Sequence, residues 1–186
     1  MERSLAHIAL FAAVIAVLGF LPKLSLGFGV PVTAQSLGVM LAGTVLGARR
    51  GTLAVLLFLL ITALGLPLLA GGRGGLGVFV GPTAGFLAGW VAAAFCIGFI
   101  VERWRSQKLA LVAGVASVIG GIVVMYAFGI IGMALVLDKT LLEATALVVA
   151  FIPGDIAKAV IAGLVTAALY RARPSSLLSR QANAVL

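Results

Sequence analysis

The stretch Phe151-Ile-Pro-Gly-Asp-Ile-Ala-Lys158 opens the last long apolar run of the chain and places an acid and a base inside it. Pro153 suits the first turn of a helix, where its missing N–H needs no partner. Asp155 then lies in that turn, where a negative charge meets the positive end of the helix dipole. Lys158 follows three residues later, so both side chains share one face. Because a charge inside a membrane segment is costly, the pair indicates a functional site.

A structural ion pair is the alternative interpretation of Asp155 and Lys158. The carboxylate can cap its own helix while the lysine extends its amine to the lipid surface. Under the functional interpretation, the pair is a polar docking point at the mouth of an apolar bundle. Such a point can hold a small ligand that has a polar head and a carboxylate.

The composition of the chain is that of a membrane protein. The chain has 186 residues, of which 63% are hydrophobic and 10% are charged, whereas a soluble domain is about 45–50% apolar and about 25% charged. The length allows roughly six spans of about 20 residues, which leaves no room for an ATPase or another soluble enzyme. We expect an all-α, polytopic membrane protein with one integral membrane domain over residues 1–186. The predicted spans are 5–21, 32–47, 52–69, 78–101, 109–137 and 153–173.

The basic residues predict the orientation of these spans, because cytoplasmic loops carry an excess of lysine and arginine. With both termini in the cytoplasm, nine basic residues fall on the inner side and three fall on the outer side. The outer three are Lys23, Arg73 and Lys139. Topology therefore explains the net charge of +8 without a nucleic-acid partner. The same orientation brings Gln35, the glycine-rich loop after residue 69 and the Asp155/Lys158 pair to the outer side, as a site that captures an external solute requires.

The loop Ala70-Gly-Gly-Arg-Gly-Gly-Leu-Gly77 contains a match to the dinucleotide fingerprint G-x-G-x-x-G. We reject a nucleotide site, because the fingerprint requires a preceding strand within a βαβ unit and a membrane helix precedes it here. Glycines let the backbone approach a ligand closely, and their N–H groups together with Arg73 can gather an anionic group. A flexible turn is the alternative. Gln35 likewise needs a partner at membrane depth, either a ligand or a neighbouring backbone.

Covalent and metal chemistry find no support in the sequence. His7 is the single histidine and Cys96 the single cysteine, and neither has a suitable partner in sequence. A nucleophile–base–orienter set is therefore missing, and no metal-ligand spacing or internal disulfide is possible. We expect a protein that is not an enzyme and holds no metal.

Three local patterns give further expectations. Ala9 and Ala13 form a small-xxx-small pair in the first span, which lets another helix approach closely, and packing within the bundle is the alternative. Ala48-Arg-Arg-Gly51 is interpreted as a tight basic turn. Residues 138–150 either begin the sixth span or form a short helix at the outer surface. We favour the surface helix, because Pro153-Gly154 is expected to break a continuous helix.

Four stretches carry a resemblance to a known family. They are Val30-Pro-Val-Thr-Ala-Gln-Ser-Leu-Gly38, Leu46-Gly-Ala-Arg-Arg-Gly51, Gly65-Leu-Pro-Leu-Leu-Ala-Gly-Gly-Arg-Gly-Gly-Leu-Gly-Val-Phe-Val-Gly-Pro-Thr-Ala-Gly-Phe86 and the Phe151–Lys158 stretch quoted above. In combination these motifs are specific, and the similarity covers nearly the whole chain. The chain resembles the BioY family, the biotin-specific substrate-binding (S) components of energy-coupling factor (ECF) transporters.

The resemblance implies a six-helix membrane protein that binds biotin with high affinity near its outer face. In this family the acid–lysine pair of the last helix belongs to the binding site, and the glycine-rich loop and the start of the fourth helix close over the ligand. An aspartate can accept from a ureido N–H of biotin, and a lysine or arginine can hold its carboxylate. The residues expected to bind biotin are Asp155, Lys158, Arg73, Gln35, Gly72, Gly75, Phe79, Thr83 and Phe86.

The resemblance also implies partners in the cell membrane. In S components, small residues of the first helix contact a transmembrane coupling protein, and Ala9 and Ala13 match that pattern. ATPase subunits of the ECF module then drive release of the vitamin inward, although some family members work without the full module. The resemblance implies that biotin is the transported ligand, and no cofactor is expected.

Two other functions compete with this expectation. A self-sufficient secondary carrier, proton-coupled through Asp155, would be expected to show an inverted repeat with paired broken helices. Only one acid–base pair is present, and nothing in the first half of the chain corresponds to it. An intramembrane enzyme would need further polar residues deep in the spans, and a lipid-binding scaffold would not need Asp155 beside Lys158.

Overall fold

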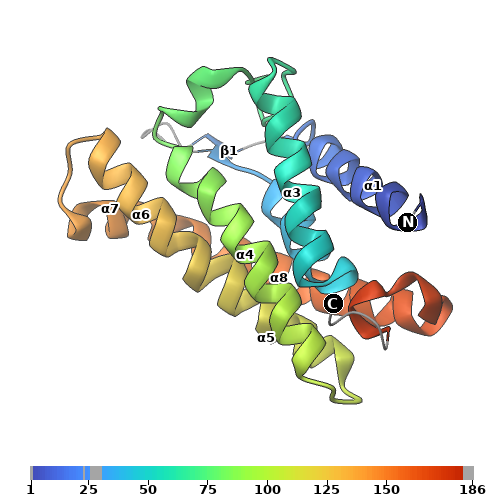
Figure 1. Ribbon diagram of the computed structural model, residues 1–186. Helices are drawn as coiled ribbons and strands as arrows, with labels where there is room; N and C mark the ends of the chain where they lie inside the picture. The colour runs from blue at the N-terminus through green and yellow to red at the C-terminus, as the bar shows by residue number, and fades with distance from the viewer. Residues whose placement is uncertain (1, 23, 26–30, 182–186) are drawn as a thin grey trace.

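The computed structural model describes residues 2–22, 24–25 and 31–181, and the chain within these ranges is almost entirely helical (Figure 1). Two short strands, β1 (Leu24–Ser25) and β2 (Pro31–Val32), pair antiparallel between the first and second helices in the chain. The predicted outer charge Lys23 lies outside the described residues. The helices are α1 (Glu2–Leu18), α2 (Gln35–Leu41), α3 (Ala48–Ala63), α4 (Ala84–Arg103), α5 (Leu109–Val118), α6 (Met125–Val136), α7 (Leu141–Val148) and α8 (Ile152–Ala172).

Short segments of other helical types join or extend these helices. Two π-helical segments, η1 (Ala42–Leu46) and η3 (Ile119–Val124), continue α2 and link α5 to α6. The 3-10 segments are η2 (Leu76–Phe79), η4 (Val149–Phe151), η5 (Pro174–Ser176) and η6 (Leu178–Arg180). The π turn η3 lies inside a continuous helical run and changes its register without ending it, whereas η1 forms the last turns of the α2 run, which ends before Gly47.

Three helices of the described chain are long and apolar enough to cross a membrane. They are α4, the continuous run Leu109–Val136 of 28 residues, and the continuous run Leu141–Ala172 of 32 residues. At about 1.5 Å per residue, each covers the roughly 30 Å of a hydrocarbon core. Two shorter helices, Ser4–Leu18 and Gln35–Leu46, are also apolar. The all-helical class and the membrane-length helices are therefore confirmed.

The expected turn at Ala48-Arg-Arg-Gly51 is wrong, because these residues form the first turn of α3. Gly47 alone makes the reversal, with a φ of 87° that a residue with a side chain rarely adopts. A carboxylate oxygen of Glu102 on α4 accepts a hydrogen bond from the Ala48 N–H at 2.9 Å, which satisfies one of the free donors at the start of the helix. The third helix consequently runs over 48–63 and ends before the predicted limit of residue 69.

The helix of the fourth predicted span begins later than the predicted limit of residue 78. Residues 76–79 form the 3-10 segment η2, and α4 begins only at Ala84. Pro82 explains the delay, because the ring of a proline disfavours helical backbone at the residue before it. From Ala84 onward the helix is regular, and it ends at Arg103, close to the predicted limit.

The predicted break at Pro153-Gly154 does not occur. Pro153 lies in the first turn of α8, where its missing N–H is not needed. The 3-10 turn η4 passes directly from α7 into α8. A capping box at Thr140 and Glu143 starts α7, and this helix packs against α6. Residues 141–151 thus run on into the last helix without the expected break, and whether they lie at the outer surface stays a prediction.

Helix α4 occupies the middle of the bundle, where it contacts α3, α5 and α6 (Figure 1). Glycines let these backbones approach closely. A Cβ built on Gly85 would lie 2.9 Å from the Cα of Gly132, and one built on Gly89 would lie 2.8 Å from the carbonyl oxygen of Met125. Gly85 and Gly89 therefore let α4 seat α6 closely. Helices α5 and α8 also pack closely, because a Cβ built on Gly163 would lie 3.0 Å from the backbone nitrogen of Gly114.

Candidate functional site

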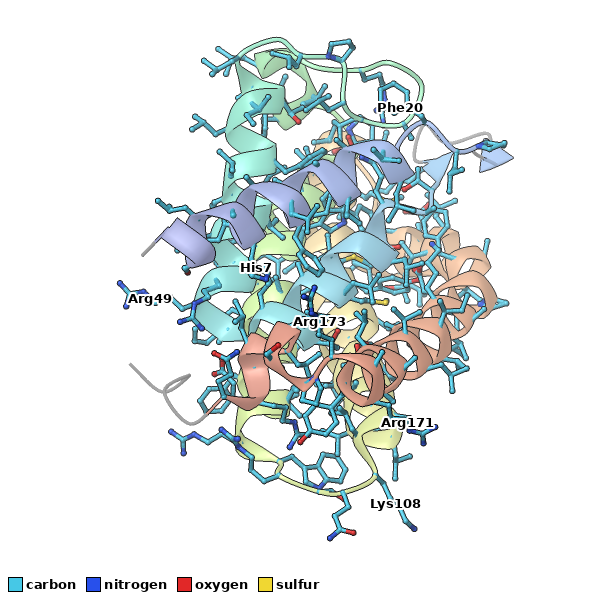
Figure 2. The ribbon with its side chains drawn as sticks, turned by 90° about the vertical axis from the view of Figure 1, so that its right-hand side faces the viewer. His7, Phe20, Arg49, Lys108, Arg171 and Arg173 are labelled. Atoms are coloured by element: carbon cyan, nitrogen blue, oxygen red, sulfur yellow. The ribbon has the colours of Figure 1, made fainter. Side chains whose placement is uncertain are left out.

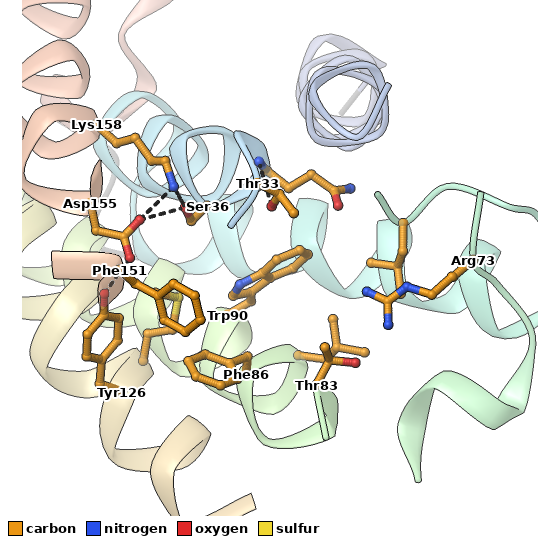
Figure 3. A pocket seen from close by; sticks show the side chains of 14 residues that line it. Thr33, Ser36, Arg73, Thr83, Phe86, Trp90, Tyr126, Phe151, Asp155 and Lys158 are labelled. Carbon is orange, nitrogen blue, oxygen red and sulfur yellow. Dashed lines mark hydrogen bonds and ion pairs between the residues drawn. The ribbon is translucent and has the colours of Figure 1, made fainter. Parts of the chain in front are cut away.

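A pocket of about 570 Å³, counting the space at its mouth, lies between α2, α4, α6, α8 and the loop that follows α3. The part of it that a water-sized sphere can enter is about 70 Å³, so the ligand-free pocket is narrower than most small-molecule sites. The lining combines an acid, two cations, hydroxyl groups and aromatic rings (Figure 3). The lining residues are Thr33, Gln35, Ser36, Leu69, Arg73, Thr83, Phe86, Leu87, Trp90, Met125, Tyr126, Phe151, Asp155 and Lys158.

The acid–base pair forms the polar end of this pocket. Nζ of Lys158 lies 2.7 Å from Oδ1 of Asp155, and the two side chains are 15% and 5% exposed. Their three-residue spacing on α8 places both on one helix face, as the sequence predicts. Helix α8 packs against α2 and thereby brings Ser36 beside the pair. The Ser36 hydroxyl lies 3.2 Å from Oδ1 of Asp155 and 3.0 Å from Nζ of Lys158.

Tyr126 completes the network from the opposite side. Its hydroxyl donates a 2.6 Å hydrogen bond to Oδ2 of Asp155. Both oxygens of the buried carboxylate are therefore engaged, which offsets part of the cost of removing the charge from water. The arrangement fixes the direction of the carboxylate and keeps one ammonium and one hydroxyl beside it. Groups held in this way can accept from and donate to the polar head of a bound molecule.

Aromatic rings form the wall next to the polar end. The ring of Phe86 on α4 packs edge-on against Tyr126 and against Phe151, with 6.2 Å between centroids in each pair. Trp90, one helical turn after Phe86, continues this wall. Its ring centroid lies 6.0 Å from that of Phe58. Such a surface suits the apolar middle of a ligand. The predicted residues Thr83 and Phe86 both line the pocket, and each is mostly buried.

Arg73 lies across the pocket from the acid–base pair (Figure 3). An isolated bridge between Leu69 and Arg73 folds the glycine-rich loop back on itself. Nε of Arg73 donates to the Ala70 carbonyl at 3.3 Å. No carboxylate of a described side chain forms an ion pair with Arg73, so its guanidinium charge is not neutralised within the described part of the chain. The pocket thus has a neutralised pair at one end and an uncompensated cation at the other.

Gln35 lines the pocket, but its amide bonds to neighbouring backbone. Nε2 donates to the carbonyl of Ile15 at 3.2 Å and to that of Leu68 at 3.0 Å, while Oε1 accepts from the Ala70 N–H at 3.0 Å. Of the two partners left open by the sequence, backbone is the one seen here. A role of Gln35 in direct ligand contact stays a prediction.

The remaining predicted residues of the glycine-rich segment do not line the pocket. Gly72 and Gly75 adopt φ angles of 71° and 79°, which explains why glycine occurs at both positions. Phe79 packs instead against the apolar core beneath the loop. These three residues shape the loop that carries Arg73, and their contact with a ligand stays a prediction.

Eight lining residues were missed by the sequence interpretation: Thr33, Ser36, Leu69, Leu87, Trp90, Met125, Tyr126 and Phe151. Tyr126 gave a usable signal, because a phenol hydroxyl inside a long apolar run needs a hydrogen-bond partner. Ser36 adjoins Gln35 and could have been found in the same way. Trp90 and Phe151 gave none, since an aromatic residue in a membrane helix serves packing as readily as ligand contact.

The predicted partner residues lie on the outer face of α1. Ala9 and Ala13 are both exposed, whereas Ala12 is buried and faces the bundle. The exposed small residues are flanked by Leu10 and Val17, which are 57% and 63% exposed. The pair Ala9 and Ala13 is therefore available to another helix, whereas Ala12 packs inside the bundle.

The described part of the chain contains no group of three or more histidine, cysteine, aspartate or glutamate side chains that could hold a metal ion. Cys96 is a half-buried free thiol on α4. The chemistry available at the site is therefore binding through hydrogen bonds, charge and apolar contact.

Comparisons with known proteins agree in both sequence and structure. Residues 2–175 match the BioY family. A protein named biotin transporter BioY from Rhodobacter capsulatus is 57% identical over 97% of this chain and 100% of its own length. One of the same name from Rhizobium etli is 56% identical over 87% and 90%. The crystal structure of the S-component for biotin from an ECF-type ABC transporter superposes with a TM-score of 0.87 at 33% identity, covering 91% of this chain and 92% of that one.

Proposed function

The chain belongs to the BioY family, and from this membership we propose that it binds biotin with high affinity and serves in its uptake as the substrate-capture subunit of an ECF-type vitamin transporter. The names of its relatives and of the matching crystal structure support this proposal. The observation that carries it is the pocket with Asp155 and Lys158 at one end, Arg73 at the other and aromatic rings between them. A protein of this kind is a transport subunit and not an enzyme.

The polar groups of the pocket match those of biotin in kind and order. Biotin has a ureido ring with two N–H donors and a carbonyl, an apolar thiophane ring and a valerate carboxylate. Asp155 can accept from a ureido N–H, and Ser36 or Lys158 can donate to the ureido carbonyl. The face formed by Phe86 and Trp90 suits the thiophane ring.

The valerate carboxylate is better placed at Arg73 than at Lys158. Lys158 is already paired with Asp155 at 2.7 Å, and a second carboxylate beside Asp155 would be repelled. Arg73 carries a charge that no described carboxylate neutralises, and its guanidinium can bind a carboxylate in bidentate fashion. We therefore place the ureido ring at the acid–base pair and the carboxylate under the glycine-rich loop.

A comparison of biotin with biotinamide, by calorimetry on the purified protein in detergent, tests this proposal. Biotin is expected to bind tightly, and biotinamide, which lacks the negative charge, is expected to bind more weakly by an order of magnitude or more, in line with the strength of charge-assisted hydrogen bonds. A well-folded protein that binds neither compound contradicts the assignment of the ligand.

The orientation in the cell membrane follows from the distribution of charge. We place both termini in the cytoplasm, with six spans in a multi-pass arrangement. Lys108 and Arg171 lie toward one end of the bundle, and Phe20 lies toward the other (Figure 2). The positive-inside rule puts the end with Lys108 in the cytoplasm. The glycine-rich loop, at the opposite end, then faces outward, where the vitamin arrives.

The proposed partners are a transmembrane coupling protein and the ATPase subunits of an ECF module. A binding protein at equilibrium cannot concentrate its ligand, so the energy must come from another component. The exposed pair Ala9 and Ala13 on α1 offers a close-packing face for the coupling protein. In this scheme biotin is the cargo, no cofactor takes part, and the positive charge serves topology and not nucleic-acid binding.

A further inference from the structure

Gln35 is one of the most completely buried polar residues of the molecule, with 1% of its surface exposed. An amide side chain has two N–H donors and an oxygen with two lone pairs. Nε2 bonds to two carbonyl groups and Oε1 bonds to one N–H. Both donors are thus occupied by backbone. In this conformation Gln35 can offer a ligand at most one lone pair, which makes it a poor candidate for a primary ligand contact.

The three backbone partners of Gln35 belong to two separate parts of the chain. Leu68 lies just before the glycine-rich loop and Ala70 is its first residue, and between them is Leu69, whose backbone bridges Arg73. Ile15 lies in the last turn of α1, 20 residues before Gln35. One side chain on α2 therefore joins the loop over the pocket to the end of the first helix.

Apart from the bonds of Gln35, few hydrogen bonds join the glycine-rich loop to the helices, and burial of Leu69 and Ala70 supplies the apolar part of its anchoring. At its far side the Gly75 N–H donates to the carbonyl of Thr62 at 2.8 Å. Its other backbone bonds run within the loop, between Leu69 and the pair Gly72 and Arg73. The bonds from Gln35 are therefore the main polar link that holds the segment around Ala70, and with it Arg73, against the pocket. The loss of two or three buried bonds of this kind is a large change for a segment with so few.

The close packing at Gly19 is a second, independent observation that the end of α1, Gln35 and the glycine-rich loop meet at one place. A Cβ built on Gly19 would lie 2.5 Å from the carbonyl oxygen of Leu68 and 2.8 Å from Nε2 of Gln35. The chain after α1 thus passes directly over the bonds that Gln35 makes. A single methyl group at this position must displace either the amide or the loop.

We propose that Gln35 is a positioning residue that holds the glycine-rich loop closed over the pocket and ties the position of the loop to the end of α1. The inference rests on the proposed function, since it concerns the retention of the same ligand. Through this tie, a partner that shifts α1 by its exposed face would withdraw the Ile15 carbonyl from Gln35 and loosen the loop that carries Arg73. Capture and release would then be linked by one side chain.

The test compares the wild type with Gln35→Met, which keeps the length of the side chain and removes its hydrogen bonds. Hydrogen exchange of the ligand-free protein is measured by mass spectrometry on peptides covering residues 66–79. We expect faster exchange at this loop and at the end of α1, with the rest of the chain unchanged. In the same variant the dissociation rate of biotin should rise by about tenfold or more, on the basis of the loss of several buried bonds, while the fraction of binding-competent protein stays the same.

Two further variants make the test decisive. Gln107→Met makes the same chemical change at an exposed site in the loop between α4 and α5 and should alter neither readout. Gly19→Ala keeps the Gln35 side chain but should break its bond to the loop by displacing the amide or the loop, so the proposal can be judged even when Gln35→Met folds poorly. Wild-type loop exchange and wild-type dissociation in either folded variant would overturn the proposal. When the wild type itself fails to bind biotin, the proposed function fails, and the exchange data still decide the role of Gln35.

Discussion

The hydroxyl of Tyr126 on α6 lies 2.6 Å from Oδ2 of Asp155 on α8, and this bond joins two helices across the polar end of the pocket. It leaves Oδ1 to face Lys158 and Ser36. The carboxylate direction is therefore set by groups from three helices. This relationship makes the site dependent on how the helices pack and not only on the residues of α8.

Tyr126→Phe should weaken both the fold and the site. The substitution leaves one carboxylate oxygen of Asp155 buried without its donor. We expect the free energy of unfolding to fall by about 1–2 kcal/mol and the affinity for biotin to fall by roughly 5- to 30-fold. Thermal unfolding in detergent and calorimetry measure the two effects. Tyr170→Phe, at the exposed end of α8, is the matched control. Unchanged affinity in Tyr126→Phe would show that the direction of Asp155 does not matter for binding.

Arg73→Gln should show which end of the ligand lies at Arg73. The change removes the uncompensated cation and keeps a side chain of moderate length. We expect biotin to bind about 10- to 100-fold more weakly, as for the loss of a charge-assisted pair, whereas the affinity for biotinamide should hardly change. Equal losses for the two compounds would place the carboxylate elsewhere, with Lys158 as the next candidate.

Gly85→Ala should destabilise the bundle, and Gly81→Ala should not. The two glycines are four residues apart, but a Cβ on Gly85 would lie 2.9 Å from the Cα of Gly132, whereas one on Gly81 meets nothing nearer than 3.9 Å. Overpacking of this kind costs about 1–3 kcal/mol. Thermal unfolding of the two variants in the same detergent gives the comparison. Similar melting temperatures would contradict the close packing of α4 against α6.

Ala9→Leu combined with Ala13→Leu should abolish uptake without affecting ligand binding. Both residues are exposed on α1, and larger side chains there prevent the close approach of a partner helix. We expect the purified variant to bind biotin as the wild type does, while cells that express it with an ECF module take up little labelled biotin. Ala88→Leu, on an exposed position of α4, is the control. Full uptake by the double variant would place the partner on another surface.

The sequence was sufficient for those features that are encoded locally. Hydropathy indicated the membrane class, and the acid–base pair stood out because charges are rare in apolar runs. The range predicted for the last span, 153–173, agrees with α8 at Ile152–Ala172. The spacing of Asp155 and Lys158 also fixed their common face, since that relationship depends only on helix geometry.

Other features depend on contacts between distant parts of the chain. The start of α3 is set by Glu102, 54 residues from Ala48, so the local sequence Ala48-Arg-Arg-Gly51 was misinterpreted as a turn. Tyr126 and Trp90 lie in helices that are apolar on every side, and periodicity therefore could not say which face meets the pocket. The role of Gln35 depends on backbone groups of α1 and of the loop, which only the folded chain brings together.

The affinity for biotin of Asp155→Ala and Asp155→Asn, measured by calorimetry against the wild type, tests the central claim most directly. Thermal unfolding of each variant is recorded in parallel, because loss of the carboxylate leaves Lys158 buried without its partner. The account predicts tight binding by the wild type and a loss of about 100-fold or more in both folded variants, as expected when a buried charged group of a site is removed. Wild-type affinity in either folded variant, or no binding by a well-folded wild type, would contradict it.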